Sequence, residues 1–200
     1  MQRFNEWTKT RESEARALAR YAHECGAKAL VLVPVNDAGF KPSESLAGLR
    51  EALRGLTPIL RDAGVRGFVE PLGFAICSLR SKREAVAAID DVGGGEVFRL
   101  VHDTFHHHLG GETQIFPERT GLVHISGVTD RDLAIADMRD AHRVLVDAAD
   151  RLGNLAQIAA LRQGGYGGAF SFEPFAESVQ QAADIGKELT ASMRFIAERI

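Results

Sequence analysis

Short apolar runs alternate with amphipathic stretches along the whole chain, and this alternation limits the choice of fold more than any other feature. Strands of parallel sheets are continuous and rich in β-branched residues, whereas surface helices repeat their apolar residues every three or four positions. The predicted strands are 29–35, 66–71, 97–102, 122–128 and 169–173; the predicted helices are 11–25, 43–62, 81–91, 154–164 and 177–200. Strands that alternate with helices predict parallel βα units. For residues 130–150 the pattern does not decide between a helix and a loop.

The apolar pattern alone leaves two architectures open. A closed barrel of eight βα units has about 250 residues, and this chain of 200 residues has five predicted strands. A doubly wound sheet would place a glycine-rich phosphate loop after the first strand, and residues 31–40 hold no such loop.

Composition narrows the class of protein. The chain is 45% hydrophobic and 26% charged, which predicts one globular domain over residues 1–200 rather than disorder. Its longest apolar run, Ala29 to Val35, is far shorter than the roughly 20 residues of a membrane helix. A net charge of −3 argues against nucleic acid as a partner, and the two cysteines suit a reducing compartment. With no apolar leader at the N-terminus, we expect a cytoplasmic protein with buried Cys25 and Cys77.

Polar residues stand in or directly after four successive predicted strands: Glu70, Asp103, His124 and Glu173. The carboxyl ends of parallel strands meet at one edge of a sheet, where ligands bind. Three carboxylates and an imidazole suit Mn²⁺, Mg²⁺, Co²⁺ or Zn²⁺ with positions left for substrate. Taken singly, each acid could instead cap the following helix, and His124 could be a hydrogen-bonded core residue.

Two further positions attract attention. In the run His106 to His108 three adjacent side chains cannot face one ion, so we expect His106 to line the site and the other two to cap or pack. Arg143 could hold a substrate oxygen or form an ordinary exposed ion pair.

Four segments carry a family resemblance: VEPLGF (69–74), VHDTFHHHLGG (101–111), VHISGV (123–128) and FSFEPF (170–175). They resemble the xylose-isomerase-like sugar isomerase and epimerase superfamily, and 2-keto-myo-inositol isomerases within it. The resemblance implies one divalent metal ion on Glu70, Asp103, His124 and Glu173. It also implies substrate contacts from His106 and Arg143, with Arg131 as the alternative arginine.

The same resemblance implies an α/β fold of the (β/α)8-barrel type. The five predicted strands would be the fourth to eighth of that barrel, so the chain would lack the first three. Because an open sheet exposes its edge strands, we expect the chain to form a homo-oligomer.

The function implied is a metal-dependent isomerase or epimerase of a keto-sugar or keto-inositol. Glu70 and Glu173 would remove and return a proton through a cis-enediolate. Two alternatives stay open: a catalytically impaired partial barrel that binds a ligand or partner, and a DNA repair enzyme of the endonuclease IV type. The second is disfavoured by the net charge and by too few strand-end histidines.

Overall fold

The computed structural model describes residues 1–39 and 42–200, and the side chains of residues 42–44 lie outside that description. The chain forms two compact units: residues 1–101 with 119–121, and residues 102–118 with 122–200. A single domain over residues 1–200 stays a prediction.

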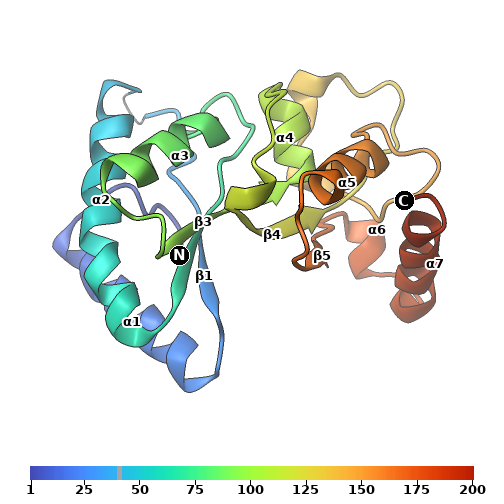
Figure 1. The fold of residues 1–200 in the computed structure, drawn as a ribbon. Coiled ribbons are helices and arrows are strands. Elements are labelled where there is room, and N and C mark those ends of the chain that lie inside the picture. The colour runs from blue at the N-terminus through green and yellow to red at the C-terminus, as the bar shows by residue number, and fades with distance from the viewer. Residues whose placement is uncertain (40–41) are drawn as a thin grey trace. The chain divides into compact units, whose positions relative to one another are not determined.

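All five predicted strands form, each followed by at least one helix (Figure 1). The strands are β1 (Ala29–Leu32), β2 (Arg66–Val69), β3 (Phe98–Asp103), β4 (Thr120–Ile125) and β5 (Phe170–Phe172). The α-helices are α1 (Lys9–Glu24), α2 (Pro42–Ala63), α3 (Lys82–Asp91), α4 (Thr104–Gly110), α5 (Asn154–Gln163), α6 (Glu177–Gln180) and α7 (Ile185–Ala197). Strand order follows chain order, and the β1–β2, β2–β3 and β4–β5 pairs are parallel, as the βα pattern predicts.

The core of the first unit lies between its strands and helices α1, α2 and α3. Leu32, Val69 and Leu100 are partners in register across β1, β2 and β3, and all three are fully buried. Helix α2 packs against both α1 and α3 and contributes a buried row of leucines. The pattern of Ser81 followed by Glu84 three residues later predicts a capped start for α3, and the Ser81 side chain does accept a hydrogen bond from the Glu84 backbone.

The second unit has its own core around β4, β5 and α5. Val123 and Ile125 of β4 pack with Ile158 and Leu161 of α5 and with Tyr166. The Tyr166 ring meets Phe170 edge-on at 5.4 Å between centroids, and its hydroxyl donates to the Ala169 carbonyl. This packing holds the ends of β4 and β5 in a fixed register, with His124 opposite Ser171.

Several local predictions are wrong. The residue type of Asn154 predicts that it caps α5, but Gly153 occupies the N-cap. The Asn154 amide is buried and donates to Ser126 O and Asp150 Oδ2 instead. The predicted terminal helix over 177–200 divides into α6 and α7, because the Asp184 side chain caps a new helix by accepting from Lys187 N.

The first predicted strand is shorter than expected. It ends at Leu32. A continuous apolar run predicts a strand buried on both faces, but the first three residues of β1 are only half-buried. The predicted burial of Cys25 is wrong, because Cys25 is exposed at the C-cap of α1. Cys77 is buried as predicted, and burial raises the pKa of its thiol.

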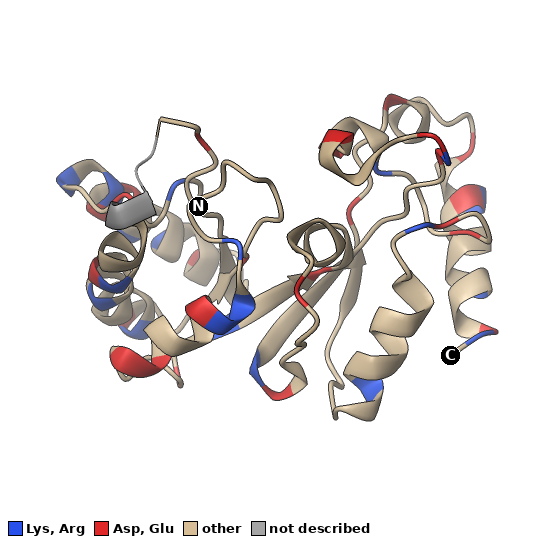
Figure 2. Cartoon of the chain, turned by 90° about the horizontal axis from the view of Figure 1, so that it is seen from above, with Lys and Arg blue, Asp and Glu red and all other residues tan. Residues whose placement is uncertain are grey.

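Acidic and basic residues are interspersed along the ribbon (Figure 2). On α1 they form ion pairs one turn apart, such as Arg16 with Glu12 and Arg20 with Glu24. Among the residues that the structure describes, no helix combines the length and the apolar character that a membrane span requires.

Gly67 on β2 tests the packing of the first unit. A Cβ at this buried position would come within 2.8 Å of side-chain carbons of both Leu32 and Phe98, which are themselves fully buried. We therefore expect Gly67→Ala to lower the free energy of unfolding by about 1–3 kcal/mol, measured by urea denaturation.

Gly95→Ala is the matched control, since a Cβ there meets no atom within 4 Å and the residue is exposed. Its stability should stay within about 0.5 kcal/mol of the wild type. Equal stabilities for the two variants would contradict the packing described for β2.

Candidate metal and substrate site

Asp103 ends β3 and also begins α4. Its Oδ1 atom accepts a hydrogen bond from His106 N at 2.9 Å, so the carboxylate caps the helix as one interpretation of the sequence suggested. Its Oδ2 atom lies 2.6 Å from Arg143 Nη2, and its side chain is fully buried. Capping and ion pairing therefore coexist in one residue, because each uses a different oxygen.

Arg143 lies in the segment whose structure the sequence left open. That segment is a loop with two short 3-10 helices (Ile135–Asp137 and Asp140–His142), and Val144 forms an antiparallel bridge with Gly127 just beyond β4. The bridge carries the Arg143 side chain into the second unit's interior, where it is 1% exposed. An exposed ion pair is thus the wrong interpretation for Arg143, whereas the alternative Arg131 is exposed.

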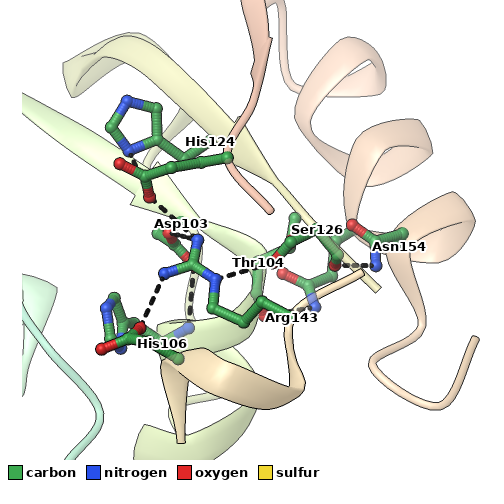
Figure 3. Close-up of polar contacts among 10 residues, drawn as sticks. Asp103, Thr104, His106, His124, Ser126, Arg143 and Asn154 are labelled. Atoms are coloured by element: carbon green, nitrogen blue, oxygen red, sulfur yellow. Dashed lines mark hydrogen bonds and ion pairs between the residues drawn. The ribbon is translucent and has the colours of Figure 1, made fainter. Parts of the chain in front are cut away.

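The Arg143 guanidinium contacts three carboxylates (Figure 3). Nη2 donates to Asp103 Oδ2 and, at 2.9 Å, to Glu173 Oε2; Nη1 donates to Asp140 Oδ1 at 3.2 Å. Nε donates to Ser126 Oγ at 2.9 Å. The guanidinium carbon also lies 4.9 Å from the ring centroids of both Phe105 and Phe175.

His124 and Glu173 complete the cluster in this unit. His124, on β4, is buried, and its Nδ1 atom lies 3.3 Å from Glu173 Oε2. Glu173 directly follows β5 and is held by a hydrogen bond from its backbone N to Ile125 O. Asp103, His124 and Glu173 each offer a ligand atom, and these atoms lie within 4.8 Å of one another.

The donor set fits a divalent ion. Metal–oxygen and metal–nitrogen bonds of about 2.0–2.2 Å place ligand atoms at most about 4.4 Å apart around one ion. The observed spacing is close to that limit, so small side-chain movements suffice. Two carboxylates with an imidazole suit Mn²⁺, Co²⁺ or Zn²⁺. They suit Mg²⁺ less well, because Mg²⁺ prefers oxygen ligands to an imidazole nitrogen.

Charge fixes the ionisation of the two buried partners. Burial alone would raise the pKa of Asp103, but electrostatic interactions with His106 and with the Arg143 guanidinium, and the hydrogen bond from His106 N, hold that pKa far below its ordinary value. Burial would lower the pKa of Arg143, and the neighbouring carboxylates, Asp103 first, raise it instead. Both groups are therefore charged at neutral pH.

The remaining predicted residues lie as follows. His106 is buried on α4 with its ring edge-on to Phe105, and the half-buried His107 packs on His102, as expected for a packing residue. Glu70 belongs to the first unit, where it follows β2, is 5% exposed and donates its backbone N–H to Leu32 O. Its part in the site stays a prediction, as do the individual roles of the other residues.

Sequence reasoning missed the residues that support the cluster. Ser126 lies two positions after His124, and this spacing alone could have placed both side chains on one face of the chain. Asp140, Phe105 and Phe175 contact Arg143 from separate segments, and no local pattern signals such contacts.

Comparison with known proteins identifies the family of this chain. The model of the xylose isomerase-like TIM barrel family matches residues 5–199. The chain belongs to this family. Its five strands with their helices are therefore a truncated form of the (β/α)8 fold, as predicted. No curated protein matches the chain significantly.

Solved structures agree with that assignment. A xylose isomerase domain containing protein from Salmonella typhimurium LT2 is 32% identical, with a TM-score of 0.87 over 97% of this chain and 72% of that one. The IolI protein, solved with a zinc atom, is 20% identical, with a TM-score of 0.83 over 95% and 70%. D-Psicose 3-epimerase from Clostridium cellulolyticum H10, solved with D-tagatose, is 15% identical, with a TM-score of 0.71 over 96% and 71%. The last two similarities show the fold alone.

The Asp103–Arg143 pair predicts a pH-dependent contribution to stability. Asn keeps the helix cap but removes the charge, so Asp103→Asn should lower the free energy of unfolding by about 3 kcal/mol at pH 7. The folded-state pKa of Asp103 is depressed, so its contribution is complete above the unfolded value of about 4 and is lost as the pH falls below it. Urea unfolding at pH 7, 5 and 3 should show the difference between the two proteins shrinking towards low pH.

Asp91→Asn is the control, because Asp91 pairs with Arg50 at the surface and its side chain is 51% exposed. That variant should stay within about 0.5 kcal/mol of the wild type at each pH. A gap between wild type and Asp103→Asn that widened on acidification would contradict the ion pair.

Proposed function

We propose that the protein is a divalent-metal-dependent isomerase or epimerase of a small keto-sugar or keto-inositol. The observation that carries the proposal is the cluster of Asp103, His124 and Glu173 at the ends of β3, β4 and β5. The family includes sugar isomerases and epimerases, and similar folds have been solved with zinc and with a ketose. Clustered ligands in such a fold favour chemistry on a polyhydroxy carbonyl compound over a purely structural role.

Asp103, His124 and Glu173 would hold the ion, with Glu70 as the proposed fourth ligand. When bound, a divalent ion polarises carbonyl and hydroxyl oxygens of a substrate and so acidifies the carbon-bound proton beside the carbonyl. The ligand types tolerate Mn²⁺, Mg²⁺, Co²⁺ or Zn²⁺.

The proton transfer is assigned to the two glutamates. One of Glu173 and Glu70 removes the proton from the carbon next to the carbonyl, and the electron pair moves to give a cis-enediolate. The other returns a proton to carbon, so the product is an isomer or an epimer and no atom is gained or lost. Glu173 is suited to this task because its side chain is 31% exposed, unlike fully buried Asp103.

His106 and Arg143 are the proposed substrate-binding residues. His106 is buried on the first turn of α4 beside Asp103, where an imidazole can donate to a substrate oxygen. Arg143 places a fixed positive charge beside the same carboxylates and stabilises negative charge that develops on substrate oxygens.

Glu173→Gln tests the reaction. Removing one base should lower the exchange of solvent deuterium into the carbon next to the carbonyl by about 10²–10⁴-fold, followed by NMR on a panel of ketoses and keto-inositols. The wild type should carry about one divalent ion per chain by elemental analysis, and the variant should carry less.

Glu177→Gln is the control, because Glu177 is exposed at the start of α6. This variant should catalyse deuterium exchange into the substrate at the wild-type rate. Turnover by the wild type without any exchange would exclude the enediolate route. A chain that takes up no ion after soaking would instead favour a ligand-binding or interaction role for a partial barrel.

We also propose that the chain self-associates. Among the described strands, β5 has one neighbouring strand, whereas the outer edge of β1 already carries hydrogen bonds with residues 1–4. The free edge of β5 offers backbone groups for pairing. Sedimentation should therefore give a mass of at least two chains of 21.7 kDa. A cooperative, well-folded monomer at micromolar concentration would overturn this proposal.

A further inference from the structure

The hydrogen bonds of Arg143 point to a role beyond contact with substrate. We propose that Arg143 is the positioning residue of the metal site, which holds the carboxylates of Asp103 and Glu173 together as ligands before an ion binds. This inference rests on the proposed function, because it concerns the same cluster.

The guanidinium has little capacity left for a substrate. Of its five N–H groups, one at Nε and one at Nη1 bind Ser126 and Asp140, and the two at Nη2 bind Asp103 and Glu173. One N–H at Nη1 remains, on a side chain that is 1% exposed. Three of the five N–H groups of this forked guanidinium therefore bind carboxylates of the protein.

Nη2 takes one oxygen from each ligand residue. Asp103 Oδ1 accepts from His106 N at the cap of α4 and Oδ2 accepts from Nη2, and each oxygen keeps a second lone pair with which it could bind an ion. Without a cation between them, two carboxylates this close repel one another, and the guanidinium offsets that repulsion. The ligand pair is thus assembled by the protein itself.

Arg143 is itself immobilised from several directions. The rings of Phe105 and Phe175 lie near its guanidinium, and Ser126 is fixed through its carbonyl by the buried Asn154 amide. The Arg143 carbonyl accepts hydrogen bonds from Phe175 N and Ala176 N, at 3.0 and 2.8 Å. Backbone and side chain of one residue therefore both fix the segment that begins with Glu173.

Two physical effects oppose each other when this side chain is removed. Loss of a nearby positive charge favours cation binding, whereas loss of preorganised ligands disfavours it. Supporting residues behind metal ligands typically contribute 10–100-fold to metal affinity. Since Nη2 binds both carboxylates directly, we expect the loss of positioning to dominate.

The test measures Co²⁺ binding to the metal-free full chain by calorimetry and by the visible absorption of the bound ion. Arg143→Met, which removes the charge and the fork, should weaken Co²⁺ binding by about 10–100-fold and alter the absorption spectrum. Arg143→Lys, which keeps a point charge without the fork, should recover part of the affinity.

Arg162→Lys is the matched control. Arg162 on α5 is exposed and stacks on Phe170 at 5.5 Å, so the variant loses an arginine–aromatic contact away from the cluster. It should bind Co²⁺ with unchanged affinity and spectrum.

Equal or tighter Co²⁺ binding by Arg143→Met would overturn the inference, because the arginine would then only compete with the ion. If Arg143→Met fails to fold by circular dichroism, Arg143→Lys decides: wild-type affinity and spectrum would overturn the inference. A wild type that binds no Co²⁺ would overturn the proposed function and this inference together, whereas binding unaffected by either variant would overturn this inference alone.

Discussion

The Arg143 guanidinium joins segments that lie far apart in the sequence: the start of α4, the residues after β4, a 3-10 turn and the segment after β5. Burying such a charge is costly unless it is paired and its donors are satisfied. Here three carboxylates and a hydroxyl receive four of its N–H groups, while the paired carboxylates gain a counter-charge. Each partner therefore depends on the others, and the arrangement of the second unit's site follows from this one network.

The position of Asp103 explains how a fold element and a site can share one residue. A strand that leads directly into a helix leaves backbone N–H groups that need an acceptor, and an aspartate supplies one with a single oxygen. The second oxygen is then directed at Arg143 by the same geometry. Structural and functional interpretations of an acidic residue at a strand end are thus not alternatives.

The sequence predicted those features that depend on local pattern. The five strands follow from their apolar runs, and the polar residues that end them follow from the way parallel strands meet at one edge. Arg143 escaped a structural prediction because its loop has no periodicity and its partners lie up to 40 residues away. The N-cap of α5 and the break before α7 were predicted wrongly because side-chain hydrogen bonds decide which residue caps a helix. The Asn154 amide donates to Ser126 O and Asp150 Oδ2 instead of capping, and the Asp184 carboxylate caps α7 by accepting from Lys187 N.

The exposed fractions of the Asp103, His124 and Glu173 side chains differ, and this difference bears on the role that each can take. The side chain of Asp103 is fully buried, that of His124 is 9% exposed and that of Glu173 is 31% exposed. A small substrate can approach the outermost of these groups, whereas the innermost is limited to holding a cation and its own partners. Phe175, 43% exposed beside Arg143, adds an apolar surface next to Glu173. This gradient favours Glu173 over Asp103 for proton transfer, because a base must touch the carbon that it deprotonates.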